Sequence, residues 1–464
     1  MPYVPPVPTL PAEHQDRAIE RVLTTPSVLV EYGTGTGKTR IIVEVCKVLV
    51  EMGDTPILIL VPNSLLEQTW EEFEKWSGST WTERNVDMLD RSYTIYQRRE
   101  KLKRGKARIM LLSHESLSYP LIREGLRSRT WAAVLVDEAS RFRNHSKRTI
   151  SLRTLGGHAR TRYAFSGNLT VRNPADSWYV MNWLQPGLFG TTKRDVFIHT
   201  YCLLGGYMGN QPVGIRPDKL TEFRAILDAN RIKCELRDVR DLPERIMTVR
   251  RVDFATRQHK AYEQMRTELR ADIERVSDDD FVTKASTYAV RLLRLQEIAA
   301  GFGRNVEGEI EYLPSPKTAE MIETLLADPE PPTVIWYWFQ PELEVIKANL
   351  DKAGIAYTVF GDANAVTDFM SGKVNVFISQ LAKGGYGLNL TRATRMIYHS
   401  LPWDLDVYTQ SQERNVRLNT VAESLEIVHL MVRNSVDEYV RDKLLDKADM
   451  SRQLSRSQAL EMLQ

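Results

Sequence analysis

The sequence predicts an α/β fold with two parallel-sheet domains and a helical insertion between them. Short apolar runs alternate with helical patterns in the N-terminal third of the chain, and the same alternation restarts at Thr333. The apolar runs are unbroken, which is typical of parallel strands covered by helices on both faces. The stretch 256–300 is charged and helical in period, with few strand signals. These observations place the helical insertion between two sheet-forming regions.

The strands expected in the N-terminal domain are five short apolar runs, at residues 28–31, 57–61, 109–112, 132–136 and 163–166. Apolar residues at helical spacing predict helices over 40–52 and 64–76. In the C-terminal domain the expected strands are 333–338, 357–360, 374–378, 395–399 and 425–431.

The expected domain boundaries follow from this alternation. They give an N-terminal domain at 1–235, a linker with the helical insertion at 236–315, a C-terminal domain at 316–448 and a tail at 449–464. The acidic trio 278–280 is expected to be a solvated turn between two helices rather than a metal site, because no nearby residue completes a ligand set. The aromatic run 336–339 lies in an expected strand, so we favour core packing over base stacking.

Composition limits the classes of protein that remain. A chain of 464 residues is long enough for two or three domains, and a net charge of +2 excludes a polycation. The three cysteines follow no metal or disulfide spacing, as expected for buried thiols in a reducing compartment. The longest apolar run, 57–61, is too short to span a bilayer, and residues 1–11 lack the features of a signal peptide. We therefore expect a cytoplasmic protein that does not enter a membrane.

The first candidate for ligand binding is a glycine-rich loop. It follows an expected strand, opens an expected helix, and reads Gly33-Thr34-Gly35-Thr36-Gly37-Lys38-Thr39. Backbone N–H groups and the helix dipole at such a loop surround a phosphate chain. Lys38 would reach the β- and γ-phosphates, and the hydroxyl of Thr39 would bind Mg²⁺. The alternative is a plain turn. Tyr32 stands where the pattern expects a small residue, so it either crowds the loop or stacks near a base.

An acidic pair, Asp137 and Glu138, follows the apolar run 132–136. It should emerge at the carboxyl end of a buried strand, beside the glycine loop. Asp137 would hold Mg²⁺, while Glu138 would orient and deprotonate the attacking water. Such pairs also occur at solvated strand ends, and the glycine loop upstream favours the catalytic interpretation.

Two arginines far along the chain, Arg414 and Arg417, would share one helix face if 408–418 is helical. A guanidinium delivered from a second domain can stabilise the charge that develops on a γ-phosphate. A surface arginine pair is the alternative.

The order of these segments resembles superfamily 2 nucleic-acid motors, and among them the SWI/SNF-like DNA translocases. Gln15 lies where that family keeps a glutamine that reads adenine. Residues 59–62 and 113–116 are similar to its strand-binding loops, and 137–140 to its Asp-Glu-Ala-His box. Residues 380–390, with Gly387, resemble its fifth motif. Residues 401–403, with Gln410 and both arginines, resemble its sixth, and 435–438 its closing element.

The resemblance implies RecA-like domains, ATP with Mg²⁺, and Gly387 and Gln410 as further nucleotide contacts. It implies an ATP-dependent translocase or helicase on duplex or branched DNA, working as a monomer, with replication, recombination or repair proteins as partners. The compact length is similar to prokaryotic or bacteriophage members. The alternatives are an RNA-directed helicase and an ATP-gated DNA clamp that does not move. Three departures stand out: 166–170 lacks the proline of the third motif, Ser140 replaces the histidine of the box, and Val416 and Asn419 alter the sixth motif.

Three basic clusters are candidates for phosphate contact. The first, 98–108, carries seven positive charges in eleven residues, and is either merely solvated or in contact with nucleic acid. The second comprises Arg141, Arg143, Lys147 and Arg148, just past the acidic pair. The third is either a further nucleic-acid surface or part of a plain charged helix pair, and comprises Arg266, Arg270, Arg275, Arg291 and Arg294.

Overall fold

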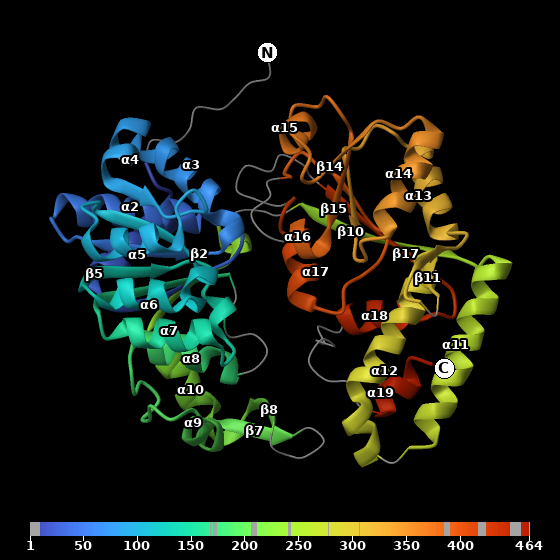
Figure 1. Cartoon of the computed structure of the whole chain (residues 1–464), viewed down its shortest axis with the longest axis horizontal. Helices are drawn as coiled ribbons and strands as arrows, with labels where there is room; N and C mark the ends of the chain where they lie inside the picture. Colours follow the sequence, from blue (N-terminus) through green and yellow to red (C-terminus); the bar gives the residue numbers. More distant parts are fainter. Residues whose placement is uncertain are drawn as a thin grey trace. The chain divides into compact units, whose positions relative to one another are not determined.

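A computed structural model of the protein (Figure 1) describes residues 10–167, 169, 174–205, 211–239, 243–276, 278–305, 307–384, 390–415, 424–445 and 456–463. The chain divides into two compact units, Met1–Asp241 and Leu242–Gln464. Each unit is built on its own parallel sheet, so the predicted fold class of two parallel α/β sheets is confirmed. Among the described helices, none is both long and apolar enough to cross a bilayer.

The sheet of the first unit has seven strands in the order β3-β4-β2-β5-β6-β1-β9, and all neighbours run parallel. The strands are β1 Ser27–Tyr32, β2 Ile57–Val61, β3 Val86–Met88, β4 Ile109–Ser113, β5 Trp131–Val136, β6 Ala159–Ser166 and β9 Arg231–Cys234. Every residue of β2, β4 and β5 is buried, as their continuous apolar sequences require. The carboxyl ends of these strands therefore share one edge.

Two apolar layers cover the two faces of this sheet. Successive residues of β1 point to opposite faces, so Leu29 joins one layer and Val28 and Val30 the other. Helices α1 Glu13–Thr24, α2 Lys38–Glu51 and α3 Leu66–Ser77 supply residues to the layer of Val28. The layer of Leu29 is covered by α5 Ile95–Arg104, α6 Pro120–Arg127, α7 Lys147–Gly156 and α8 Pro174–Leu184. The remaining elements are α4 Ser79–Asn85, α9 Arg194–Tyr201, α10 Leu220–Ala229 and the hairpin of β7 Cys202–Gly205 and β8 Gln211–Ile215.

The sheet of the second unit has six strands in the order β10-β17-β16-β13-β15-β14. They are β10 Glu244–Val252, β13 Thr333–Tyr337, β14 Tyr357–Val359, β15 Val376–Gln380, β16 Arg395–Tyr398 and β17 Ser424–Val432. Apolar residues of α13 Pro316–Ala327 and α14 Glu342–Ala353 pack on one face. Trp336 and Tyr337 are buried in β13, which confirms the core interpretation for these two aromatic residues. The other helices are α15 Ala365–Met370, α16 Leu381–Gly384, α17 Leu405–Gln412 and α18 Val436–Leu445.

The long helices α11 Thr256–Glu274 and α12 Asp278–Ala299 follow β10, which already belongs to the second sheet. The helical insertion therefore lies within the second unit (Figure 1). The short hairpin of β11 Phe302–Arg304 and β12 Ile310–Tyr312 follows, and the C-terminal helix α19 Arg456–Glu461 packs on α11 and α12. The acidic trio 278–280 forms the first turn of α12, so its prediction as a turn was wrong. Helix α11 ends at Glu274 and α12 begins at Asp278, so the connection between the two helices ends before the trio.

Candidate nucleotide-binding site

The glycine-rich loop joins the end of β1 to the start of α2, as its sequence predicts. Gly35 and Gly37 adopt φ values of 83° and 85°, a left-handed conformation that favours glycine. A Cβ atom on Gly37 would lie 2.2 Å from Nε2 of Gln15, so a side chain there would displace the Gln15 amide from its present position. Gly33, Thr34 and Thr36 lie in the same turn, and the N–H of Gly33 donates to the carbonyl of Cys234 in β9 at 2.9 Å. Thr39 is the second residue of α2.

Lys38 is the first residue of α2, and only 8% of its surface is exposed. Its Nζ donates to the carbonyl of Tyr32 at 3.0 Å and to that of Gly33 at 3.5 Å. The ammonium is thus held over the loop by two neutral acceptors. A phosphate oxygen, which is a stronger acceptor, can replace them.

The start of α1 is fastened to the same loop. Nε2 of Gln15 donates to the carbonyl of Thr36 at 3.1 Å, and Nε2 of His14 lies 3.0 Å from the same oxygen. Oε1 of Gln15 accepts the N–H of Ala12 at 3.0 Å. Gln15 is therefore bonded to the glycine loop, while its contact with adenine stays a prediction.

Tyr32 ends β1 with a buried side chain, so its ring is not exposed to stack on a base. Its ring is buried, with 1% exposed, and its hydroxyl donates to the carbonyl of His14 at 2.6 Å. Burial raises the pKa of Tyr32 to about 12, so the hydroxyl keeps its proton. This hydrogen bond is a second fastening between β1 and α1.

The acidic pair follows β5 at the same edge of the sheet. Asp137 is buried, and its Oδ1 accepts the N–H of Glu138 at 2.9 Å. Burial raises the pKa of Asp137 to about 7, and the charge of Glu138 adds to this, while Lys38 acts in the opposite direction. A buried carboxylate with a raised pKa fits a cation site, because a bound cation would stabilise the ionised form. Glu138 adopts a φ of 46°, a left-handed conformation that is uncommon for a non-glycine residue and recurs at functional sites.

One strand, β6, lies between the glycine loop and the acidic pair. Its last residue Ser166 is in register with Glu31 of β1, and the following Gly167 lies against the loop. A Cβ on Gly167 would be 3.5 Å from Oγ1 of Thr34 and 3.8 Å from Nζ of Lys38. The segment after β6 thus closes the site on the side of the acidic pair.

Glu31 holds this segment in place and was not singled out from the sequence. Its buried carboxylate accepts the N–H of Leu169 at 2.9 Å and pairs with Nη1 of Arg231 at 2.5 Å. A carboxylate at the end of a buried strand, just before the glycine loop, was the signal available. The altered third motif is therefore tied to β1 through Leu169, whereas 168 and 170 lie outside the described residues.

Of the four candidate residues of the second unit, Gly387 precedes β16 in the sequence and the other three follow it. The helix predicted over 408–418 ends at Gln412, and Arg414 stands in a turn, so the predicted helix was too long. Arg414 is buried, and its carbonyl accepts the N–H of Leu390 at 3.2 Å. Oε1 of Gln410 is buried and makes no hydrogen bond within the described part of the chain. Gly387 and Arg417 lie outside the described residues, and the roles of all four stay predictions.

A comparison with protein families adds the decisive observation. Residues 23–300, more than half of the chain, match the family described as the SNF2-related domain. The chain belongs to the SNF2-related domain family.

Several named proteins are also similar to this chain. The transcription regulatory protein SNF2 of Saccharomyces cerevisiae is 24% identical over 90% of this chain and 26% of its own length. The human DNA excision repair protein ERCC-6 is 21% identical, over 84% of this chain and 28% of its own length. An uncharacterized ATP-dependent helicase of Mycoplasma genitalium is 21% identical, over 83% of this chain and 36% of its own length. The chain thus spans about a quarter to a third of the relatives it matches. A solved structure, the Sulfolobus solfataricus SWI2/SNF2 ATPase core in complex with dsDNA, has a TM-score of 0.45 at 20% identity, over 94% of this chain and 91% of that one.

The second basic cluster lies at the same edge of the seven-stranded sheet as the glycine loop. Glu115, which follows β4, organises it. Its carboxylate accepts the N–H of Asn63 at 3.1 Å and pairs with Arg141 at 3.4 Å and Arg148 at 3.8 Å. The neighbouring His114 is buried, and burial, followed by the charge of Arg141, lowers its pKa to about 3. The loops after β2, β4 and β5 are thus held together through one carboxylate.

Many basic residues of the other two clusters form ion pairs with carboxylates of the same unit. Most of the first cluster lies on α5, and only its last residues, 105–108, lead into the amino-terminal end of β4. Lys101 pairs with Asp87 at 2.7 Å, while Arg104 is 83% exposed. In the third cluster all five arginines pair with carboxylates of α11 and α12, which supports the charged helix pair. Within the described residues, no group of three or more His, Cys, Asp or Glu side chains could hold a metal ion.

Proposed function

We propose that this chain is an ATP hydrolase that is stimulated by duplex DNA and uses turnover to move along it. The observation that carries this proposal is the shared sheet edge, where the phosphate loop with Lys38 and the buried Asp137 flank the end of β6. The family membership and the names of the relatives support ATP as the nucleotide.

In the proposed reaction the loop N–H groups, the N-terminus of α2 and Lys38 bind the β- and γ-phosphates. Lys38 would exchange the carbonyls of Tyr32 and Gly33 for phosphate oxygens. Thr39 and Asp137 would hold Mg²⁺, which when bound neutralises phosphate charge. Glu138 would accept the proton of the attacking water and orient it toward the γ-phosphorus.

The second unit would complete the reaction when the units close. Arg414 and Arg417 are proposed to stabilise the charge that develops on the γ-phosphate, and Gln410 and Gly387 to contact the nucleotide. Duplex DNA is proposed to lie on the second basic cluster, since its contacts would be made mainly with phosphates. We further propose a cytoplasmic monomer, because one chain supplies both sets of residues.

The test is the steady-state ATPase rate without nucleic acid and with single-stranded DNA, duplex DNA, branched DNA or RNA, at two salt concentrations. We expect strong stimulation by duplex or branched DNA that weakens with salt. Stimulation by RNA alone would replace the proposal with an RNA-directed helicase. A rate indifferent to every nucleic acid would contradict it.

A further inference from the structure

One buried amide in the helical insertion holds part of the connection between β16 and α17. Gln296 lies near the C-terminal end of α12, and its side chain is completely buried. Its Nε2 donates to the carbonyl of Leu401 at 2.9 Å, and its Oε1 accepts the indole N–H of Trp403 at 2.8 Å. An indole nitrogen can only donate and a carbonyl oxygen can only accept, so these two partners fix the orientation of the amide.

The connection between β16 and α17 comprises residues 399–404. Its first two residues, His399 and Ser400, are bonded to the buried carboxylate of Glu342 in α14, His399 through Nδ1 at 2.6 Å. Its last residue, Asp404, caps α17 with its side chain, which accepts two N–H groups of the first turn. Glu342 therefore holds the first half of the connection, the amide in α12 holds the second half, and α17 starts where the second half ends.

The amide of Gln296 occupies a buried position, where a polar group is costly unless it is hydrogen-bonded. An apolar side chain of similar size would fill the same space without that cost. A satisfied pair of hydrogen bonds does more than fill space, because it specifies one position for the segment 401–403. This segment leads into the helix that carries Gln410 and precedes Arg414, the two residues proposed above to act on the nucleotide.

We propose that Gln296 is a positioning residue for ATP hydrolysis, which places α17, and with it Gln410 and Arg414, through residues 401–403. The inference rests on the function proposed above for Arg414. The helical insertion thereby acts on the turnover of ATP through one side chain of α12.

The test compares kcat and the KM for ATP of the full chain on duplex DNA. Gln296→Met keeps the length of the side chain and removes both hydrogen bonds, and Trp403→Phe removes the bond that the indole donates. Each should lower kcat about tenfold with little change in KM, because the glycine loop of the first unit is untouched. The double variant should lose little more than Gln296→Met alone, since both changes remove the same contact.

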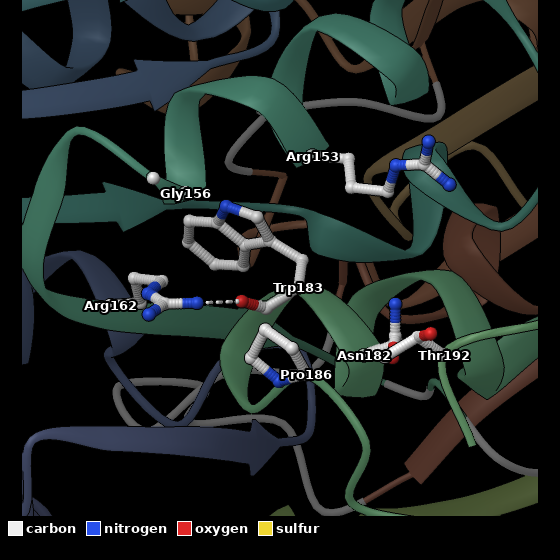
Figure 2. A pocket seen from close by; sticks show the side chains of 8 residues that line it. Arg153, Gly156, Arg162, Asn182, Trp183, Pro186 and Thr192 are labelled. Atoms are coloured by element: carbon white, nitrogen blue, oxygen red, sulfur yellow. Dashed lines mark hydrogen bonds between the residues drawn. The ribbon is translucent and has the colours of Figure 1, made fainter.

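Two control variants remove comparable groups elsewhere. Tyr262→Phe removes a buried hydrogen bond between the insertion and α18, in which the hydroxyl accepts the N–H of Val436 at 2.9 Å. Trp183→Phe, in the first unit, removes a buried indole N–H that has no acceptor among the described residues. It keeps the backbone carbonyl of Trp183, to which Arg162 donates at 2.7 Å (Figure 2). Both controls should keep the kcat of the unmodified chain, even where thermal unfolding shows a loss of stability.

Arg414→Ala separates the failure of this inference from the failure of the proposed function. In the Arg414→Ala chain, Gln296→Met should lower kcat by less than about twofold, because the group that it positions is gone. If Arg414→Ala lowers kcat and Gln296→Met does not, the inference is wrong and the proposed function stands. If Arg414→Ala keeps the kcat of the unmodified chain, the role proposed for Arg414 is wrong, and the inference with it.

Two further outcomes would overturn the positioning role. One is a fall in kcat in Tyr262→Phe as large as that in Gln296→Met, since a general loosening of the insertion would then explain both. The other applies where Gln296→Met fails to fold, because Trp403→Phe then carries the test. An unchanged kcat in Trp403→Phe would show that the bond to Gln296 does not position α17.

Discussion

Removal of the Tyr32 hydroxyl tests whether the hydrogen bond between β1 and α1 supports the glycine loop. In Tyr32→Phe the ring stays in its buried position, and the 2.6 Å hydrogen bond to the carbonyl of His14 is lost. Leaving a buried acceptor without its partner costs about 1–3 kcal/mol. We take the lower end, about 1–1.5 kcal/mol, because a carbonyl within α1 can also accept an intrahelical hydrogen bond.

If this loss falls on the ordering of the loop, the KM for ATP should rise about five- to twelvefold with little change in kcat. The assay is steady-state ATP hydrolysis, paired with thermal unfolding of the full chain. Tyr201→Phe is the control, since its hydroxyl donates to Glu222 at 2.6 Å and burial, followed by the hydrogen bond to Glu222, raises its pKa to about 12 as well. The control should lose comparable stability and keep the KM of the unmodified chain. Equal KM values for Tyr32→Phe and the unmodified chain would refute the reasoning.

Three further predictions concern the charged groups. Because the pKa of Asp137 is raised to about 7 in the folded state, the nucleotide-free chain should lose stability as pH rises from about 4 to 7. Asp137→Asn should remove the part of this pH dependence that comes from Asp137. Parallel plots of the free energy of unfolding against pH for the two chains would contradict the burial argument. Lys38→Ala and Arg417→Ala should each lower kcat for ATP by at least about a hundredfold, and wild-type turnover in either would remove that residue from the site. Glu115→Gln should tighten DNA binding severalfold at low salt, because it frees Arg141 from a competing carboxylate, and fluorescence anisotropy that shows weaker binding would contradict this.

Local sequence was sufficient for the parts of the fold whose burial is complete. The run 57–61 is a strand with the predicted bounds, because its five apolar residues are all buried. The strand β10 was missed, because it lies at a sheet edge and is exposed along most of its length, so its sequence shows no clean alternation. The helix predicted over 408–418 ends at Gln412, because the N–H of Arg414 bonds to the carbonyl of Ser411 at 3.3 Å instead of to that of Gln410.

The candidate site also has parts that the sequence predicted and parts that it did not. The glycine loop and the acidic pair could be predicted, because each follows its own strand and parallel strands bring their carboxyl ends together. The strand at 163–166 was predicted as well, but its position between them could not be, since strand order is not determined by local sequence. The support by Glu31 depends on Arg231, 200 residues away, and the role of Glu115 depends on three separate loops. Contacts of this kind become visible only when the sheet is assembled.

Displacement of a labelled third strand from a DNA triplex tests the central claim, ATP-driven movement along duplex DNA, most directly. The chain should release the third strand only with ATP, after a delay that grows with the length of duplex between the entry point and the triplex. Glu138→Gln should bind the same DNA and release nothing. Release by Glu138→Gln at the rate of the unmodified chain, or no release by a chain that hydrolyses ATP on duplex DNA, would contradict movement and favour a clamp.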